Sequence, residues 1–196
     1  MRSQTNQEET FLRMTEEPVS KLIPRLAIPT IISMLVTSIY NMADTYFVSQ
    51  IGTSASAAVG INFSLQAMIQ AIGFTLGMGS GNYVSRALGK KLRKKAEIIA
   101  AMGFFTAIIL GLLLAVVGLL RLDSLVKLLG ATSTVAPYAR SYGRYILIAA
   151  PYMCASFVLN NLLRSQGKAF KSMIGIATGG VLNMVLDPIL IFKLNL

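Results

Sequence analysis

An amide and a carboxylate lie one helical turn apart near the end of the sequence, inside a long apolar run. Asn183 and Asp187 are four residues apart, so on a helix their side chains share one face. Pro188 has no N–H, so the carbonyl of Met184 loses its helical partner and becomes available as a ligand. These oxygens form a group suited to Na⁺ or to a shuttled proton. The alternative is an Asp-Pro helix cap near the surface of a membrane.

The composition is that of a membrane protein. Of the 196 residues, 54% are hydrophobic and 13% are charged, which is too apolar for an ordinary soluble domain. The net charge of +10 would suggest nucleic-acid binding in a soluble protein. Here the basic residues lie between apolar runs, so we expect them to set the membrane orientation. The sequence therefore predicts an all-α polytopic membrane protein, with membrane lipid and no nucleic acid as a partner.

Five apolar runs are long enough to cross a bilayer, since about 20 helical residues span about 30 Å. We expect residues 1–20 to form a mobile cytoplasmic tail and residues 121–137 to form a short amphipathic connection. Residues 21–196 then form one helical lobe. Its predicted spans are about 26–51, 57–84, 98–120, 142–163 and 173–192.

The basic residues are distributed unevenly between the two sides of this topology. Thirteen of the 18 Lys and Arg residues lie in the tail, the loop between spans two and three, and the loop between spans four and five. The positive-inside rule therefore places the N-terminus in the cytoplasm. We expect a multi-pass protein of the cell (cytoplasmic) membrane.

Two predicted spans carry polar stripes. On the first span, Ser33, Thr37, Tyr40, Asn41 and Asp44 recur at steps of three and four, so we expect this face to turn towards other helices. The second span has an amide-rich outer half, whose two glutamines could pack or line a cavity, and a glycine-rich inner half suited to close helix packing. Its stripe consists of Asn62, Gln66, Gln70, Gly73, Gly77 and Gly81.

The predicted topology brings several polar groups to the outer half of the membrane. The first and fifth spans both run outward, and Asp44 and Asp187 lie near their ends. The second span runs inward and carries its amides in its first half, so these also lie in the outer half of the membrane. Because an intramembrane carboxylate is costly, it tends to face a bundle interior or a watery cavity. This convergence predicts an ion or substrate cavity, whereas Asn160 and Asn161, at the cytoplasmic end of the fourth span, are interpreted as loop caps.

Four segments together resemble the multidrug and toxic compound extrusion (MATE) transporters. They are residues 39–48 (Ile-Tyr-Asn-Met-Ala-Asp-Thr-Tyr-Phe-Val), 82–89, 163–167 and 183–192, and the similarity extends from about Lys21 to Leu196. The last segment is similar to the MepA-like branch in particular. The resemblance implies twelve helices in two lobes of six, exporting cationic amphipathic compounds in exchange for Na⁺ or H⁺. With five spans, we expect a partial N-terminal lobe that lacks the C-terminal half of the transporter.

The resemblance also implies roles for individual residues. Asp44, Asn183 and Asp187 match the coupling site of the family's N-terminal lobe, where they would hold Na⁺ or a proton. Tyr40 matches a tyrosine beside them. No cofactor is implied apart from the coupling ion. The candidate cavity and substrate residues are Tyr40, Asn62, Gln66 and Gln70.

Other functions remain open on the sequence. A lipid-linked oligosaccharide flippase of the wider superfamily is one, although such carriers often line their cavities with basic residues and the intramembrane charges here are acidic. A non-transporting truncated relic is another. An intramembrane enzyme is disfavoured, because the chain has no His and no nucleophile–base pair. A two-Asp protease would need two carboxylates close enough to share a proton.

Overall fold

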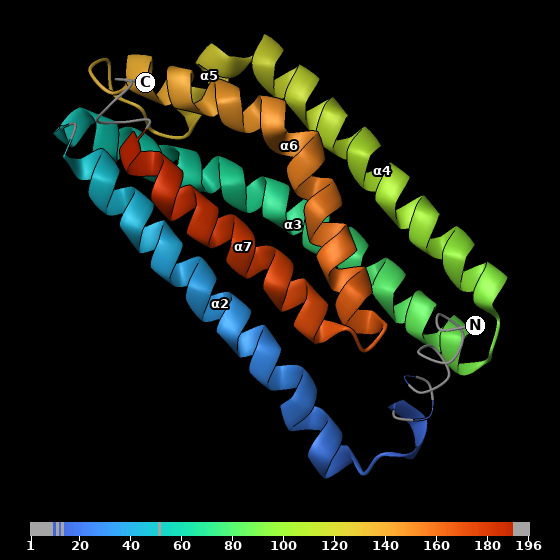
Figure 1. Ribbon diagram of the computed structural model, residues 1–196. Coiled ribbons are helices and arrows are strands. Elements are labelled where there is room, and N and C mark those ends of the chain that lie inside the picture. The colour runs from blue at the N-terminus through green and yellow to red at the C-terminus, as the bar shows by residue number, and fades with distance from the viewer. Residues whose placement is uncertain (1–9, 11, 13, 51, 190–196) are drawn as a thin grey trace.

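The computed structural model describes residues 10, 12, 14–50 and 52–189, without the side chains of Asp187 and Pro188. Every element in this part of the chain is a helix, and five of the helices are long and apolar enough to cross a membrane. The predicted all-α class is thus confirmed. The elements are α2 (Val19–Ser49), α3 (Thr53–Gly89), α4 (Arg93–Leu120), α5 (Leu122–Leu128), α6 (Ala136–Ser165) and α7 (Ala169–Pro188) (Figure 1).

Most of the helices extend beyond the apolar runs that predicted them. α3 begins at Thr53 and ends at Gly89, where hydropathy alone predicts 57–84, because polar residues continue the helix at both ends. The predicted connection 121–137 contains the short helix α5. Val126 of α5 is buried against Ala136 and Ala139 of α6, which holds the short helix against the start of the next span, and the exposed Asp123 carboxylate pairs with Arg140 at 2.7 Å.

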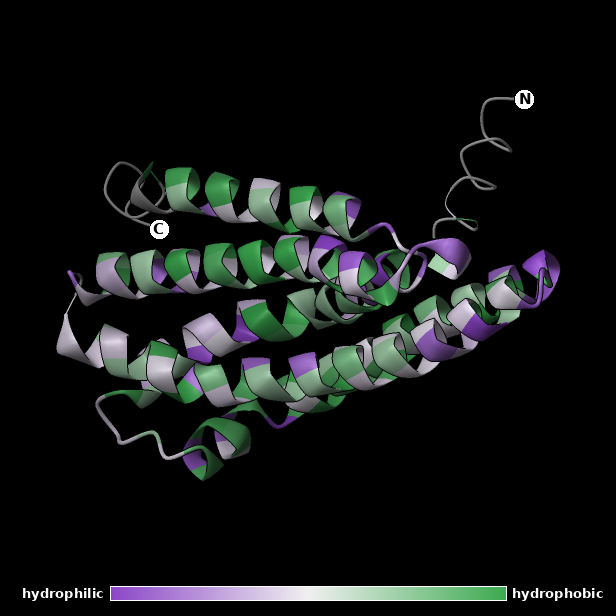
Figure 2. Ribbon diagram, turned by 90° about the horizontal axis from the view of Figure 1, so that it is seen from below, coloured by the Kyte–Doolittle hydropathy of each residue, from purple (hydrophilic) through white to green (hydrophobic). Residues whose placement is uncertain are grey.

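The five long helices alternate in direction. The turn between α3 and α4, the turn between α6 and α7 and the segment before α2 therefore lie at the same end of the bundle (Figure 1). At this end Met14 lies against Gly167, and Glu17 pairs with Arg25 at 3.4 Å. Figure 2 shows hydrophilic residues gathered at this end of the helices. We call it the basic end, after the Lys and Arg residues of 86–95 and 164–171.

Glycines join α3 to α6, which run in the same direction. A Cβ on any of three buried glycines, spaced four residues apart on α3, would meet a side chain of α6 within 3.2 Å. Glycine allows this close approach of the two helices, so the predicted packing role of this stripe is confirmed. The pairs are Gly73 with Phe157, Gly77 with Asn161, and Gly81 with Ser165.

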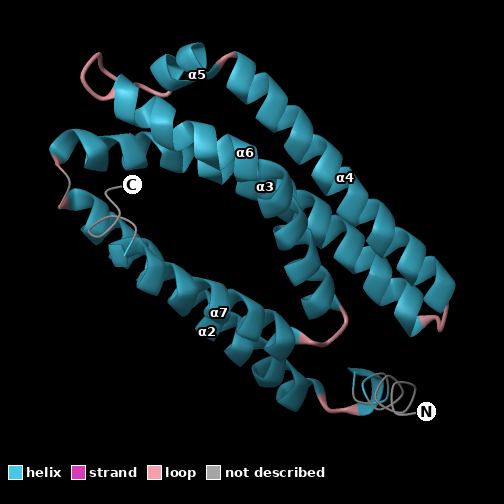
Figure 3. Cartoon of the chain, turned by 45° about the horizontal axis from the view of Figure 1, so that its top comes forward, coloured by secondary structure: helices cyan, strands magenta, loops and turns pink. Residues whose placement is uncertain are grey.

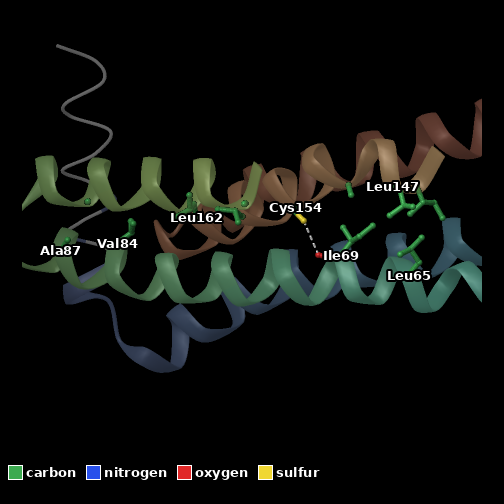
Figure 4. Close-up of a cluster of buried hydrophobic side chains, with 12 residues drawn as sticks. Leu65, Ile69, Val84, Ala87, Leu147, Cys154 and Leu162 are labelled. Carbon is green, nitrogen blue, oxygen red and sulfur yellow. Dashed lines mark hydrogen bonds between the residues drawn. The ribbon is translucent and has the colours of Figure 1, made fainter. Parts of the chain in front are cut away.

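An apolar core fills the space between α3, α4 and α6 (Figure 4). Ile69, Leu147 and Val158 are completely buried. The thiol of Cys154 is buried with them and donates to the carbonyl oxygen of Ile69 at 3.6 Å, which satisfies the one polar group in this cluster. These three helices form the first and more closely packed layer of the molecule.

The helices α2 and α7 form a second layer. α2 packs chiefly against α7, and both touch the other helices much less (Figure 3). The two layers meet at both ends of the bundle: α7 begins directly after α6 at the basic end, and α2 ends beside the start of α3 at the opposite end (Figure 1). The pair α2–α7 is thus a separate unit beside the three-helix layer.

Substitution of Gly111 by Ala should destabilise the three-helix layer. A Cβ there would lie 2.6 Å from Cα of Pro151 and 3.0 Å from the carbonyl oxygen of Ala150, and backbone atoms cannot move aside cheaply. We expect the free energy of unfolding to fall by about 1–3 kcal/mol. Each kcal/mol should lower the thermal midpoint by about 2–4 °C. The measurement is thermal unfolding in detergent, with Gly60→Ala as control because nothing lies within 4 Å of its Cβ. Equal midpoints for the two variants would contradict the contact.

Candidate functional site

The polar face of α2 turns inward. Ser33 is 2% exposed, and Thr37, Tyr40, Asn41 and Asp44 are half-buried. The opposite face is apolar and exposed, with Met34, Leu35, Ile39 and Met42 among its residues. The helix therefore turns its polar residues inward and its apolar residues outward, as expected of a membrane span and as its stripe predicts. Asp44 lies on the inner side.

Most hydroxyls on α2 are satisfied by their own helix. Ser33 donates to the carbonyl oxygen of Pro29 at 2.7 Å, and Thr37 donates to that of Ser33 at 2.9 Å. Asp44 differs, since no hydrogen bond or ion pair joins its carboxylate to another group in the described part of the chain. Its oxygens are therefore available to a ligand.

Gly180 sets the register between α2 and α7. A Cβ at this position would lie 3.0 Å from the Tyr40 ring and 3.2 Å from the Val36 side chain. Both helices run towards the end opposite the basic end. Residues that follow this contact by the same number of positions on α2 and α7 therefore lie at the same height along the bundle. Asp44 lies about six residues, or roughly 9 Å, beyond the contact, which is level with residue 186 or so of α7.

The same register places Asp187 on the α2 side of α7. Asp187 follows Gly180 by seven residues, close to two full turns, so both positions lie on one face of the helix. The side chain of Asp187 itself lies outside the described part of the structure. Asn183 is exposed, one turn before Asp187. Pro188 is the last residue of α7, and because it has no N–H the carbonyl of Met184 lacks its usual donor four residues on.

The three amides of α3 differ in burial and in their position along the helix. Asn62 is 1% exposed, and its amide donates to the carbonyl oxygens of Ala58 at 2.9 Å and Ala139 at 3.1 Å. It therefore sits in the contact between α3 and α6. Gln66 is half-buried and Gln70 is exposed. Since Gln70 lies 17 residues into α3, roughly 26 Å along it, the structure does not bring it level with Asp44.

A polar link between α6 and α7 has no clear signal in the sequence. The hydroxyl of Ser172, 1% exposed, donates to Oδ1 of Asn160 at 2.9 Å, and Nε of Arg164 donates to the same hydroxyl at 3.4 Å. Asn160 also donates to the carbonyl oxygen of Ser156 within its own helix, as Asn161 does to that of Phe157. The interpretation of Asn160 and Asn161 as loop caps is thus wrong, because their amides bind within α6 and, for Asn160, across to α7.

This arrangement of helices can be compared with known proteins. The family model described as MatE matches residues 29–189, which is most of the chain. The chain belongs to the MatE family. The multidrug export proteins MepA of Staphylococcus haemolyticus and of Staphylococcus aureus are each 30% identical to it over 190 residues. These matches cover 96% of this chain but 42% of each relative, so the chain spans less than half the length of the curated relatives that it matches.

Solved structures agree with this membership in fold. A crystal structure of MATE in complex with MaD3S superposes with a TM-score of 0.87 at 33% identity, over 93% of this chain and 41% of that one. A MOP superfamily transporter from Pyrococcus furiosus, described as having a binding pocket of reverse polarity, gives 0.88 at 33% identity, over 93% and 40%. The five helices therefore have the fold of part of a MatE-family transporter.

Substitution of Gly180 by Val should separate α2 from α7. Its Cβ would already crowd Tyr40 and Val36, and two further methyl groups add to this. We expect the free energy of unfolding to fall by about 1–3 kcal/mol, which is measured as a lower thermal midpoint in detergent. Gly179→Val is the matched control, since nothing lies within 4 Å of its Cβ and the cost of Val in a helix is the same for both. If Gly179→Val proves as damaging as Gly180→Val, Gly180 does not set this contact.

Proposed function

We propose that this chain is the N-terminal part of a cation-coupled antiporter that exports cationic amphipathic compounds. The proposal places it in the cytoplasmic membrane with its N-terminus inside the cell. It is supported by membership of the MatE family and by relatives named as multidrug export proteins. The observation that carries it is the contact of Gly180 with Tyr40, and from this register we expect residues 44 and 187 at a similar depth on adjoining helices.

The proposed mechanism is competition for these carboxylates. Asp44 and Asp187 attract a cationic compound when they are charged, and a bound Na⁺ or proton removes that attraction. A ligand shifts a conformational equilibrium only by its differential affinity for the two states. Ion binding from outside, preferred by the outward-open state, would therefore release the compound there. Asn183 and the carbonyl of Met184 would supply further oxygen ligands to Na⁺.

The charge on the inward face of α2 favours a cationic cargo. Between Ser33 and Phe47 the helix contains Asp44 but no Lys or Arg. A flippase for anionic lipid-linked oligosaccharides would need basic groups to hold a pyrophosphate. The relatives are transporters, and we propose no enzymatic activity for this chain.

The remaining helices of the relatives would complete the cavity. In transporters built from repeats, substrate sites lie between the repeats, and one repeat moves against the other. We propose that tyrosine and amide side chains of this lobe, Tyr40, Gln66 and Gln70 among them, face the substrate from one side only. Transport is therefore to be assayed in the natural reading frame that contains this chain.

Asp44→Asn and Asp187→Asn should each abolish coupled export. The substitution removes the charge with little change in shape, so membrane insertion should persist. A coupling free energy of 1–3 kcal/mol corresponds to about 5–150-fold, and we expect efflux of a cationic dye to fall at least about ten-fold. The measurement is dye efflux from vesicles under an imposed Na⁺ or proton gradient, with insertion checked by the yield of folded protein.

Asp123→Asn is the matched control for this experiment. Asp123 is an exposed aspartate of α5 that pairs with Arg140 and is remote from the α2–α7 contact. Its variant should transport normally. Full efflux by the Asp187→Asn or Asp44→Asn protein would disprove the assigned coupling site.

A further inference from the structure

A groove runs along the outside of the three-helix layer, between α3 and α4. It has a volume of about 460 Å³ and opens at the surface of the bundle. Tyr83 of α3 and Lys95 of α4 lie nearest the basic end, while Thr106 of α4 lies at the far end. The lining between them is mostly apolar, with Ile99 and Met102 on the α4 side.

The length of the groove matches one leaflet of a bilayer. Lys95 and Thr106 are 11 residues apart on α4, which is roughly 16 Å of helix. Half of a typical hydrocarbon core is about 15 Å. An acyl chain that entered beside Lys95 would therefore reach the middle of the membrane within the groove.

Positive charge gathers at the mouth of this groove. Six basic residues lie within residues 86–95, and Lys95 is exposed. Lys95 takes part in neither of the two ion pairs found in the described part of the chain, Arg25–Glu17 and Arg140–Asp123. Glu97 is the only acidic residue of α4. The positive-inside rule explains why basic residues gather in this loop. It does not explain why an apolar groove begins beside Lys95.

A glycine opens the floor of the groove. Gly79 lines it, and nothing lies within 4 Å of the position that a Cβ would occupy there. The next residue, Ser80, packs against Gly103 of α4, where a Cβ would lie 2.8 Å from the serine side chain. The two helices thus touch at Ser80 and leave space beside Gly79.

We propose that this groove binds an anionic phospholipid from the leaflet at the basic end. The phosphate would lie beside Lys95 and the hydroxyl of Tyr83, and one acyl chain would follow the groove past Gly79 to Thr106. Basic pockets between membrane helices favour anionic headgroups, and tyrosine is enriched at the level of the headgroups. The site is independent of the coupling site, because it lies on the other layer of the molecule.

The absence of tryptophan from the sequence provides a direct test. Tyr83→Trp introduces one fluorophore into these 196 residues at the mouth of the groove, where the indole N–H replaces the tyrosine hydroxyl as a donor to the phosphate. The 196-residue chain is reconstituted into phosphatidylcholine vesicles. Chain-brominated phosphatidylglycerol, added as a minor component, should quench it several-fold more than the same fraction of brominated phosphatidylcholine. Ile98→Trp is the control reporter, since Ile98 is exposed on α4 near the same level and does not line the groove.

Two further substitutions in the Tyr83→Trp protein separate the headgroup from the chain. Lys95→Gln should lower the preference for phosphatidylglycerol about five-fold, the effect of one basic side chain at an anionic surface. Lys171→Gln, at the same end but away from the groove, should leave it unchanged. Gly79→Leu should fill the groove and reduce quenching by both lipids, while Gly175→Leu, on open surface of α7, should not.

Three results would overturn the proposal. Equal quenching by the two lipids at residue 83 would show that the groove does not select charge. The same preference at residue 98 as at residue 83 would assign the effect to the basic loop as a whole. No quenching by either lipid at residue 83 would show that protein, from a second copy or another segment, covers the groove.

Discussion

Gly180 lies against Tyr40 and Val36, and this contact fixes the register of the two helices that carry Asp44 and Asp187. A larger residue would push α7 away from α2 and tilt the polar face of α2 out of alignment. A charged side chain exposed to lipid costs free energy. Two helices that each carry an Asp avoid this cost when both carboxylates face a shared inner surface. The close approach at a glycine makes that shared surface possible.

The two layers of the molecule are packed by different means. In the α3–α4–α6 layer, glycines meet side chains or backbone at under 3.3 Å and an apolar core fills the remaining space. Among the described residues, no buried hydrophobic cluster lies between α2 and α7, and the inner face of α2 is polar and half-buried. The layer that carries Asp44 is thus the less tightly packed one, which suits the proposed exchange of ions and substrate.

Hydropathy and periodicity predict much of this arrangement. The five spans, the inward face of α2 and the packing role of Gly73, Gly77 and Gly81 all follow from the spacing of apolar, polar and small residues. The helix ends do not, because polar residues beyond the apolar core continue the helix, as at both ends of α3. α3 gains four residues at one end and five at the other, so its midpoint hardly moves, and Gln70 lies near that midpoint rather than level with Asp44. The link between Ser172 and Asn160 depends on how α6 meets α7, which a pattern within either helix does not contain.

Cross-linking of residues 44 and 187 tests the proposed coupling site most directly. The protein would carry Cys at both positions and Ser in place of Cys154, the only native cysteine. The register predicts rapid disulfide formation under mild oxidation, and far slower cross-linking when Cys is placed at Met42, on the exposed face of α2, in place of residue 44. Equal rates for the two pairs, or no cross-link at 44 and 187 in folded protein, would contradict a shared cation site between α2 and α7.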